Sequence, residues 1–162
     1  MDTPELRVDK RSGGVRCTIG VDRPPAEVYA VLGDVESWPQ WLPTVTSVRR
    51  TEPGDGGGPG PSGAFRVKQP RLPVATWRVT RAAAPYTFTW VNARGGVTVT
   101  AGHVIEPDGA GGSRVTLTID QSGPLRRLVA PFTTALTATY VRTEAEALKR
   151  RCENPPQDQQ DS

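Results

Sequence analysis

The stretch LRRLVAPFTTALTATYVRTEAEALKRR, residues 125–151, decides the fold that we predict. Large apolar or aromatic side chains recur at every fourth position within it: Leu128, Phe132, Leu136 and Tyr140. This spacing is typical of an α-helix with one apolar side. Such a helix needs a partner surface, and we expect the rest of the chain to supply a sheet.

Pro131 lies inside this stretch and limits how the helix can begin. A proline has no backbone N–H, and its ring clashes with the preceding turn of a helix. Two arrangements stay open. Either a short turn covers 125–130 and the main helix starts near Pro131, or the helix kinks at this residue.

Length, charge and cysteine content narrow the class of protein. The 162 residues predict a single domain over 12–152, between a flexible N-terminus (1–11) and a disordered tail (153–162). The net charge is +3 with basic and acidic residues interspersed, so we expect no nucleic acid partner. No apolar run is long enough for stable membrane insertion. Two cysteines without metal-binding spacing fit reduced thiols in a cytoplasmic monomer or homodimer.

The first third of the chain alternates between strand and helix signals. Residues 14–21 predict a strand, and Pro24–Pro25 predicts the start of a short helix that ends at Gly33. The segment VESWPQWLP predicts a second helical turn, and a β-branched strand follows at 44–50. Residues 52–63 hold six glycines and three prolines, which indicates a mobile connection or a lid over a pocket.

Five further strands, divided by Gly- and Pro-rich turns, precede the helix: 64–69, 74–81, 86–92, 97–106 and 113–121. Close spacing of this kind indicates antiparallel pairing. The prediction is an α+β fold in which a curved seven-stranded antiparallel sheet wraps around the C-terminal helix.

Strand alternation predicts which side chains face that helix. The inner face is rich in aromatic residues, but it also carries His103, Gln69 and Asn92. An unpaired polar group in an apolar interior costs about 1–3 kcal/mol. We therefore expect these groups to line a cavity that binds a small molecule.

Four segments suggest a family: PPAEVYAVLGDVESWPQWLPTVTSV (24–48), FRVKQPRLPVATWRVT (65–80), GGVTVTAGHVIEP (95–107) and GSRVTLTI (112–119). They resemble the START/Bet v 1-like (SRPBCC) superfamily, and within it the bacterial polyketide cyclase/dehydrase and lipid-transport group. The resemblance implies the helix-grip fold, with a hydrophobic cavity between the sheet and the C-terminal helix. It also implies, for cyclases of the group, an arginine inside the cavity.

The resemblance leads to a first hypothesis, an enzyme that cyclises and dehydrates a polyketide-like or aromatic molecule without a cofactor or metal. An imidazole exchanges protons near neutral pH, so His103 is the expected general acid or base, and Tyr140 the expected phenolic donor. The other side chains expected to contact the ligand are Trp38, Trp41, Gln69, Trp77, Phe88, Trp90, Asn92, Phe132 and Leu136.

Two other functions stay open at this point. The same cavity would serve a non-catalytic carrier or sensor of a lipid or other apolar ligand, and some relatives bind protein partners instead. The expected arginine is also hard to place. Arg66, Lys68 and Arg78 alternate outward, which leaves only Arg71 and Arg94 near the mouth.

Overall fold

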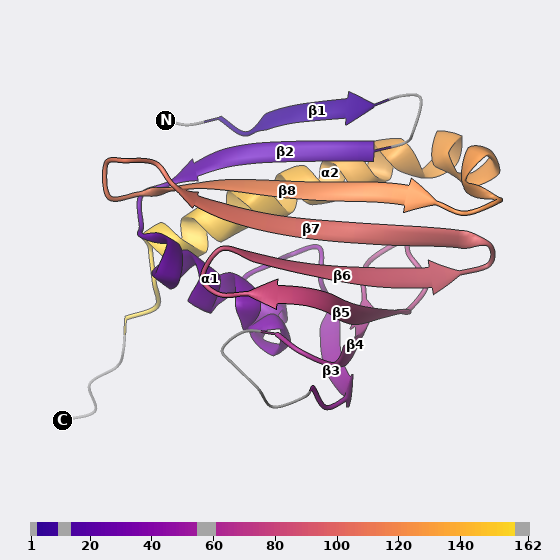
Figure 1. Ribbon diagram of the computed structural model, residues 1–162, viewed down its shortest axis with the longest axis horizontal. Coiled ribbons are helices and arrows are strands. Elements are labelled where there is room, and N and C mark those ends of the chain that lie inside the picture. Colours follow the sequence, from indigo (N-terminus) through magenta and orange to yellow (C-terminus); the bar gives the residue numbers. More distant parts are fainter. Residues whose placement is uncertain (1–2, 10–13, 55–60, 158–162) are drawn as a thin grey trace.

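The computed structural model describes residues 3–9, 14–54 and 61–157. The expectation of a disordered tail therefore falls partly outside the described residues, as does the middle of the Gly- and Pro-rich connection. One antiparallel sheet bends around a long C-terminal helix without closing into a barrel (Figure 1).

The sheet has eight strands in the order β1-β2-β8-β7-β6-β5-β4-β3, and every neighbouring pair is antiparallel. Their bounds are β1 Glu5–Asp9, β2 Gly14–Val21, β3 Ser47–Glu52, β4 Ala64–Lys68, β5 Ala75–Ala83, β6 Thr87–Arg94, β7 Val97–Pro107 and β8 Ser113–Ser122. The alternation of apolar residues and the Gly/Pro turns thus predicted the succession of strands along the chain from β2 onward.

The prediction of seven strands is wrong by one, because β1 adds to the edge of the sheet. It pairs with β2 from Glu5 opposite Thr18 to Asp9 opposite Gly14. This strand lies within the segment that we expected to be flexible. Only Leu6 of β1 packs against the core, and Val8 is exposed, so the segment has almost no hydrophobic pattern of its own. Its order comes from the free edge of β2.

Two short helices connect β2 to β3, as predicted. Helix α1 (Pro25–Gly33) starts with a proline in its first turn, and the 3₁₀ helix η1 (Val35–Gln40) follows directly. Val28, Leu32 and Trp38 are buried, and the Trp38 indole N–H donates to the Leu32 carbonyl at 3.0 Å. This hydrogen bond fixes one aromatic wall of the space under the sheet.

Helix α2 (Arg126–Glu153) is continuous through Pro131, so a helix that begins near Pro131 is wrong. The helix packs mainly on β2 and β8, and Val141, Ala145 and Leu148 of its C-terminal half are buried. The N-terminal half is only partly buried. The helix is therefore anchored to the sheet at one end and extends over the sheet at the other.

The apolar stripe that we predicted on α2 does not face the sheet along its whole length. Phe132 is 86% exposed and Leu128 is 68% exposed. Four residues turn a helix by about 40° more than one full turn, so the stripe drifts by about 120° between Leu128 and Tyr140. The residues that face inward in this half are Val129, Thr133 and Thr137.

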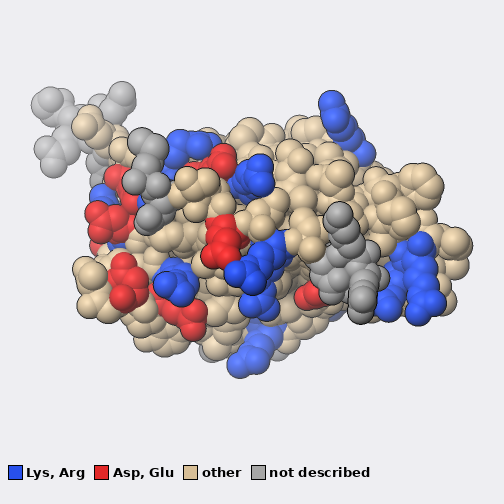
Figure 2. Space-filling model, turned by 90° about the horizontal axis from the view of Figure 1, so that it is seen from above, with Lys and Arg blue, Asp and Glu red and all other residues tan. Residues whose placement is uncertain are grey.

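Charged side chains are spread over the outside of the molecule. Figure 2 shows Lys and Arg interspersed with Asp and Glu over much of the face seen from above. Arg78 and Glu52 form an exposed pair through two hydrogen bonds of 2.7 and 2.8 Å, which lower the pKa of Glu52. No helix within the described residues is long and apolar enough to cross a membrane.

Because Leu148 of α2 faces the core and Phe132 faces solvent, we expect substitutions at the two positions to change the stability of the protein by different amounts. Leu148→Ala removes a side chain that is 0% exposed, and we expect the free energy of unfolding to fall by about 2–5 kcal/mol. Phe132→Ala should change it by less than about 0.5 kcal/mol. Urea unfolding followed by tryptophan fluorescence measures both. A large loss from Phe132→Ala would contradict the assigned helix face.

Both cysteines are free and buried, Cys17 in β2 and Cys152 in the last turn of α2. Burial raises the pKa of Cys17 to about 11 and that of Cys152 to about 12. The thiolate is the nucleophilic form, and these thiols stay protonated over the neutral range. They therefore have the properties of small core residues.

We accordingly expect neither thiol to react with iodoacetamide at pH 8 in the native protein, and both to react in urea. The physical reason is that unfolding returns each pKa toward its ordinary value and opens access to reagent. Mass spectrometry of the alkylated protein counts the modified thiols. Rapid labelling of either cysteine under native conditions would be inconsistent with the burial described here.

Candidate active site

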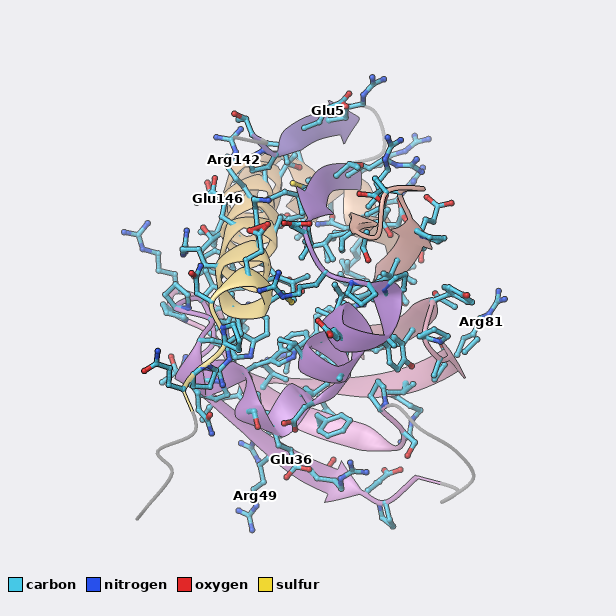
Figure 3. All side chains as sticks on the ribbon, turned by 90° about the vertical axis from the view of Figure 1, so that its left-hand side faces the viewer. Glu5, Glu36, Arg49, Arg81, Arg142 and Glu146 are labelled. Atoms are coloured by element: carbon cyan, nitrogen blue, oxygen red, sulfur yellow. The ribbon has the colours of Figure 1, made fainter. Side chains whose placement is uncertain are left out.

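A cavity of about 220 Å³ lies between α2, from Val129 to Glu144, and the inner face of strands β4 to β8. Figure 3 shows side chains between the helix and the sheet, while Arg49 and Arg81 point away from that space. Trp38, Trp77 and Trp90 form its aromatic wall, with ring centroids 5.2 Å (Trp38–Trp90) and 5.3 Å (Trp77–Trp90) apart. An apolar protein cavity of about 150 Å³ holds benzene, so this one has room for a larger ligand.

His103 of β7 faces this cavity, as the strand alternation predicts, and is 3% exposed. It lies directly opposite Phe88 of β6, and the two rings stack with centroids 3.9 Å apart. His103 Nδ1 is 3.2 Å from the Phe88 carbonyl oxygen. A carbonyl only accepts hydrogen bonds, so Nδ1 carries a hydrogen and donates it.

The second ring nitrogen of His103 faces a carboxylate from the helix. Nε2 is 3.4 Å from Glu144 Oε1, and the Glu144 side chain is only 18% exposed. With Nδ1 protonated, a neutral imidazole presents a lone pair at Nε2, and an ionised carboxylate also only accepts. The two atoms attract each other when one proton is present on either of them. The His103–Glu144 pair is thus suited to take up and release a single proton.

Glu144 lines the cavity but was not among the residues that the sequence analysis expected there. It follows Tyr140 by four positions and precedes Leu148 by four, so it continues the inner face of α2. An acidic residue on an otherwise apolar helix face is the signal that would have identified it. The analysis followed only the apolar members of that face.

Tyr140 also reaches the cavity wall, but its hydroxyl group is engaged. It donates its hydrogen to the carbonyl of Pro70 in the turn between β4 and β5. This bond ties α2 to that turn. A phenolic donor for a ligand, the role that we expected, would require the bond to break, and the structure gives Tyr140 the role of a tether.

The polar residues that we expected on the sheet are in the wall. Asn92 and half-buried Gln69 line the cavity, and Asn92 Nδ2 donates to the Thr76 carbonyl at 2.7 Å. Gln121, which alternation places on the same inner face, lines it as well and is 7% exposed. Gln121 was not among the ligand contacts that we expected.

Four aromatic or apolar residues expected to contact a ligand lie outside the wall. Phe88 is behind the His103 ring, and Trp41 packs against Trp38 with ring centroids 6.1 Å apart. Leu136 is half-buried away from the lining, and Phe132 faces solvent because of the drift of the helix stripe. The three other tryptophans, Trp38, Trp77 and Trp90, line the cavity.

The arginine implied by the family resemblance has no counterpart in the cavity. No Lys or Arg belongs to its lining in the part of the chain that the structure describes. Lys68 and Arg94 donate to the carbonyls of Leu72 and Val74, at 2.8 and 3.2 Å, and so brace the turn between β4 and β5. Arg71 is exposed in the same turn. Among the described residues, no cluster of three or more His, Cys, Asp or Glu side chains could hold a metal ion.

Solved structures with the same architecture are numerous, at low sequence identity. A START superfamily protein from Mycobacterium smegmatis is 19% identical, with a TM-score of 0.72 over 88% of this chain and 99% of its own. The ZhuI aromatase/cyclase from Streptomyces sp. R1128 is 17% identical, with a TM-score of 0.71 over 92% and 94%. The di-domain ARO/CYC protein BexL, of the BE-7585A biosynthetic pathway, is 22% identical, with a TM-score of 0.67 over 88% of this chain and 48% of its own.

These likenesses confirm a START-like fold. No curated protein matches the chain significantly. A family model described as polyketide cyclase / dehydrase and lipid transport matches residues 13–153, which is nearly the whole chain from β2 to the end of α2. The chain therefore belongs to the polyketide cyclase/dehydrase and lipid transport family.

Proposed function

We propose that the protein binds a small polyketide-like or aromatic molecule in this cavity and promotes its cyclisation or dehydration by acid–base catalysis. The observation that carries the proposal is the buried His103–Glu144 pair on the wall of an apolar cavity. Membership of the family and the likeness to aromatase/cyclase folds support a role in ligand binding. The pair supports the chemistry.

The reaction that suits the pair is proton transfer next to a ketone. In an aldol closure, the pair removes a proton from a carbon beside one carbonyl, and that carbon then bonds to a second carbonyl carbon of the same molecule. In the dehydration that follows, a second carbon-bound proton is removed and the hydroxyl group leaves as water after gaining a proton. The pair takes up one proton and returns one in each step, so it ends unchanged.

The aromatic wall contributes by holding the reacting carbons together. A folded chain inside a narrow apolar space needs less ordering on the way to ring closure than the same chain in water. We assign Trp38, Trp77 and Trp90 to this role, and Gln69 and Asn92 to polar contacts with ligand oxygen atoms. Tyr140 keeps the turn between β4 and β5 in place.

The proposal predicts that His103→Gln and Glu144→Gln each lower turnover by about 10²–10⁴-fold, because each removes a partner of the proton-transfer pair. The assay uses a triketone that closes by aldol addition and dehydration to a bicyclic enone, followed by the ultraviolet absorbance of the enone. The dissociation constant of the saturated bicyclic analogue should change by less than about threefold, since the cavity keeps its shape.

Glu146→Gln is the matched control. Glu146 is also on α2 but outside the cavity lining, so this variant should turn over like the wild type. Wild-type rates in both His103→Gln and Glu144→Gln would overturn the catalytic proposal. Tight binding of the triketone by the wild type without conversion would instead favour a carrier.

A further inference from the structure

Two buried oxygen atoms face the cavity without a hydrogen-bond partner. They are Gln121 Oε1 and Glu144 Oε1, and they are the only buried side-chain polar atoms without such a partner among the residues described. Both are acceptors. Glu144 Oε1 is 3.4 Å from His103 Nε2 and is paired when one proton is shared between them. A buried acceptor that stays unpaired costs about as much as a lost hydrogen bond, so Gln121 Oε1 favours a ligand that brings a hydrogen to it.

The orientation of the Gln121 amide follows from its neighbours on α2. Thr133 Oγ1 is 3.2 Å from the Val129 carbonyl and must donate to it, because a carbonyl only accepts. Thr133 Oγ1 therefore accepts the hydrogen of Gln121 Nε2 at 3.1 Å. With the NH₂ group held by the helix, Oε1 is the free end of the amide.

Gln121 and the His103–Glu144 pair occupy different ends of the cavity. On the sheet, Gln121 is opposite Val99, and His103 is four residues further along β7, which corresponds to about 13 Å. On the helix, Thr133 and Glu144 are eleven residues apart, about 16 Å. The two estimates agree that Gln121 and the His103–Glu144 pair lie near opposite ends of the cavity, and Trp90, which is opposite Ala101, lies between them on the sheet.

From this arrangement we infer that Gln121 is a binding residue for a neutral, hydroxyl-bearing ligand, and that the cavity rejects carboxylates. This inference rests on the proposed function, and it names the class of molecule that the site takes. A phenolic or enolic hydroxyl donates to Gln121 Oε1, while the opposite end of the ligand lies against His103.

Anionic ligands are disfavoured for a separate reason. The described lining contains the carboxylate of Glu144 and no Lys or Arg, so a buried carboxylate ligand would be unpaired and would face acceptor oxygens. This excludes a free fatty acid as the preferred ligand, although its chain would suit the apolar walls.

The test compares three naphthalenes that carry a hydroxyl, a methoxy or a carboxylate group at the same ring carbon. Binding is followed at pH 8 by quenching of tryptophan fluorescence, with calorimetry as a second measurement. For the wild type we expect naphthol to bind about tenfold more tightly than methoxynaphthalene, which can only accept, and naphthoate to bind most weakly.

Gln121→Leu should remove the preference for naphthol and leave the affinity for methoxynaphthalene within about threefold. Thr133→Val is the second variant. It releases Gln121 Nε2 as a donor, so methoxynaphthalene should gain affinity relative to naphthol. Gln40→Leu, at an exposed glutamine of η1, is the matched control and should bind all three probes like the wild type.

Equal binding of naphthoate and naphthol, or an unchanged naphthol preference in Gln121→Leu, would overturn the inference. A hydroxyl preference that depends on Gln121 would support it even if the triketone assay showed no turnover, so the two proposals fail separately. If none of the probes bound to the wild type at millimolar concentration, this inference would fall, and the triketone assay would still decide the catalytic proposal.

Discussion

The seating of the C-terminal half of α2 on β2 and β8 is the constraint on which the rest of the structure depends. Ala145 and Leu148 are completely buried there and fix the helix against one half of the sheet. In its N-terminal half the helix also approaches the sheet through a polar contact, where Thr133 accepts a hydrogen bond from Gln121 of β8. The positions that face inward in that half include Thr133 and Thr137, which are too small to fill the gap. The cavity is a consequence of this difference between the two halves.

The chemistry of the cavity depends on which side-chain N–H and O–H groups already donate hydrogen bonds to backbone carbonyls. The Phe88 carbonyl takes the Nδ1 hydrogen of His103, the Pro70 carbonyl takes the hydroxyl hydrogen of Tyr140, and the Thr76 carbonyl takes one from Asn92. These bonds leave oxygen atoms and one ring nitrogen facing the interior. Polar residue types alone would suggest a mixed wall, but the bonding pattern makes the buried part of this wall mainly an acceptor surface.

Local sequence patterns were sufficient for most of the fold. The strand at Gly14–Val21 has the predicted bounds, and the inward position of His103 follows from simple alternation along β7. The face of α2 that points toward the sheet was harder to predict. Two equally apolar stripes can be drawn on α2, and only packing against the sheet decides that Val129 faces inward and Leu128 outward. β1 depends on the edge of β2, which no local pattern reveals.

The site itself could be predicted only in part. His103 and the tryptophans Trp38, Trp77 and Trp90 were identifiable because residue type and strand face both point to them. Glu144 was not, because its role depends on the distance between a helix and a strand that are separated by a long stretch of chain. The same is true of Gln121, whose amide is oriented by a threonine of α2.

The open sheet leaves two edge strands, β1 and β3, whose free backbone groups are potential templates for pairing with other chains. Both edges carry charge: Glu5 and Arg7 form an ion pair on β1, while β3 contains Arg49, Arg50 and Glu52. Charged edge strands disfavour edge-to-edge association. The fold can therefore remain unclosed around its helix, with room for a cavity, without the aggregation that an apolar open edge would invite.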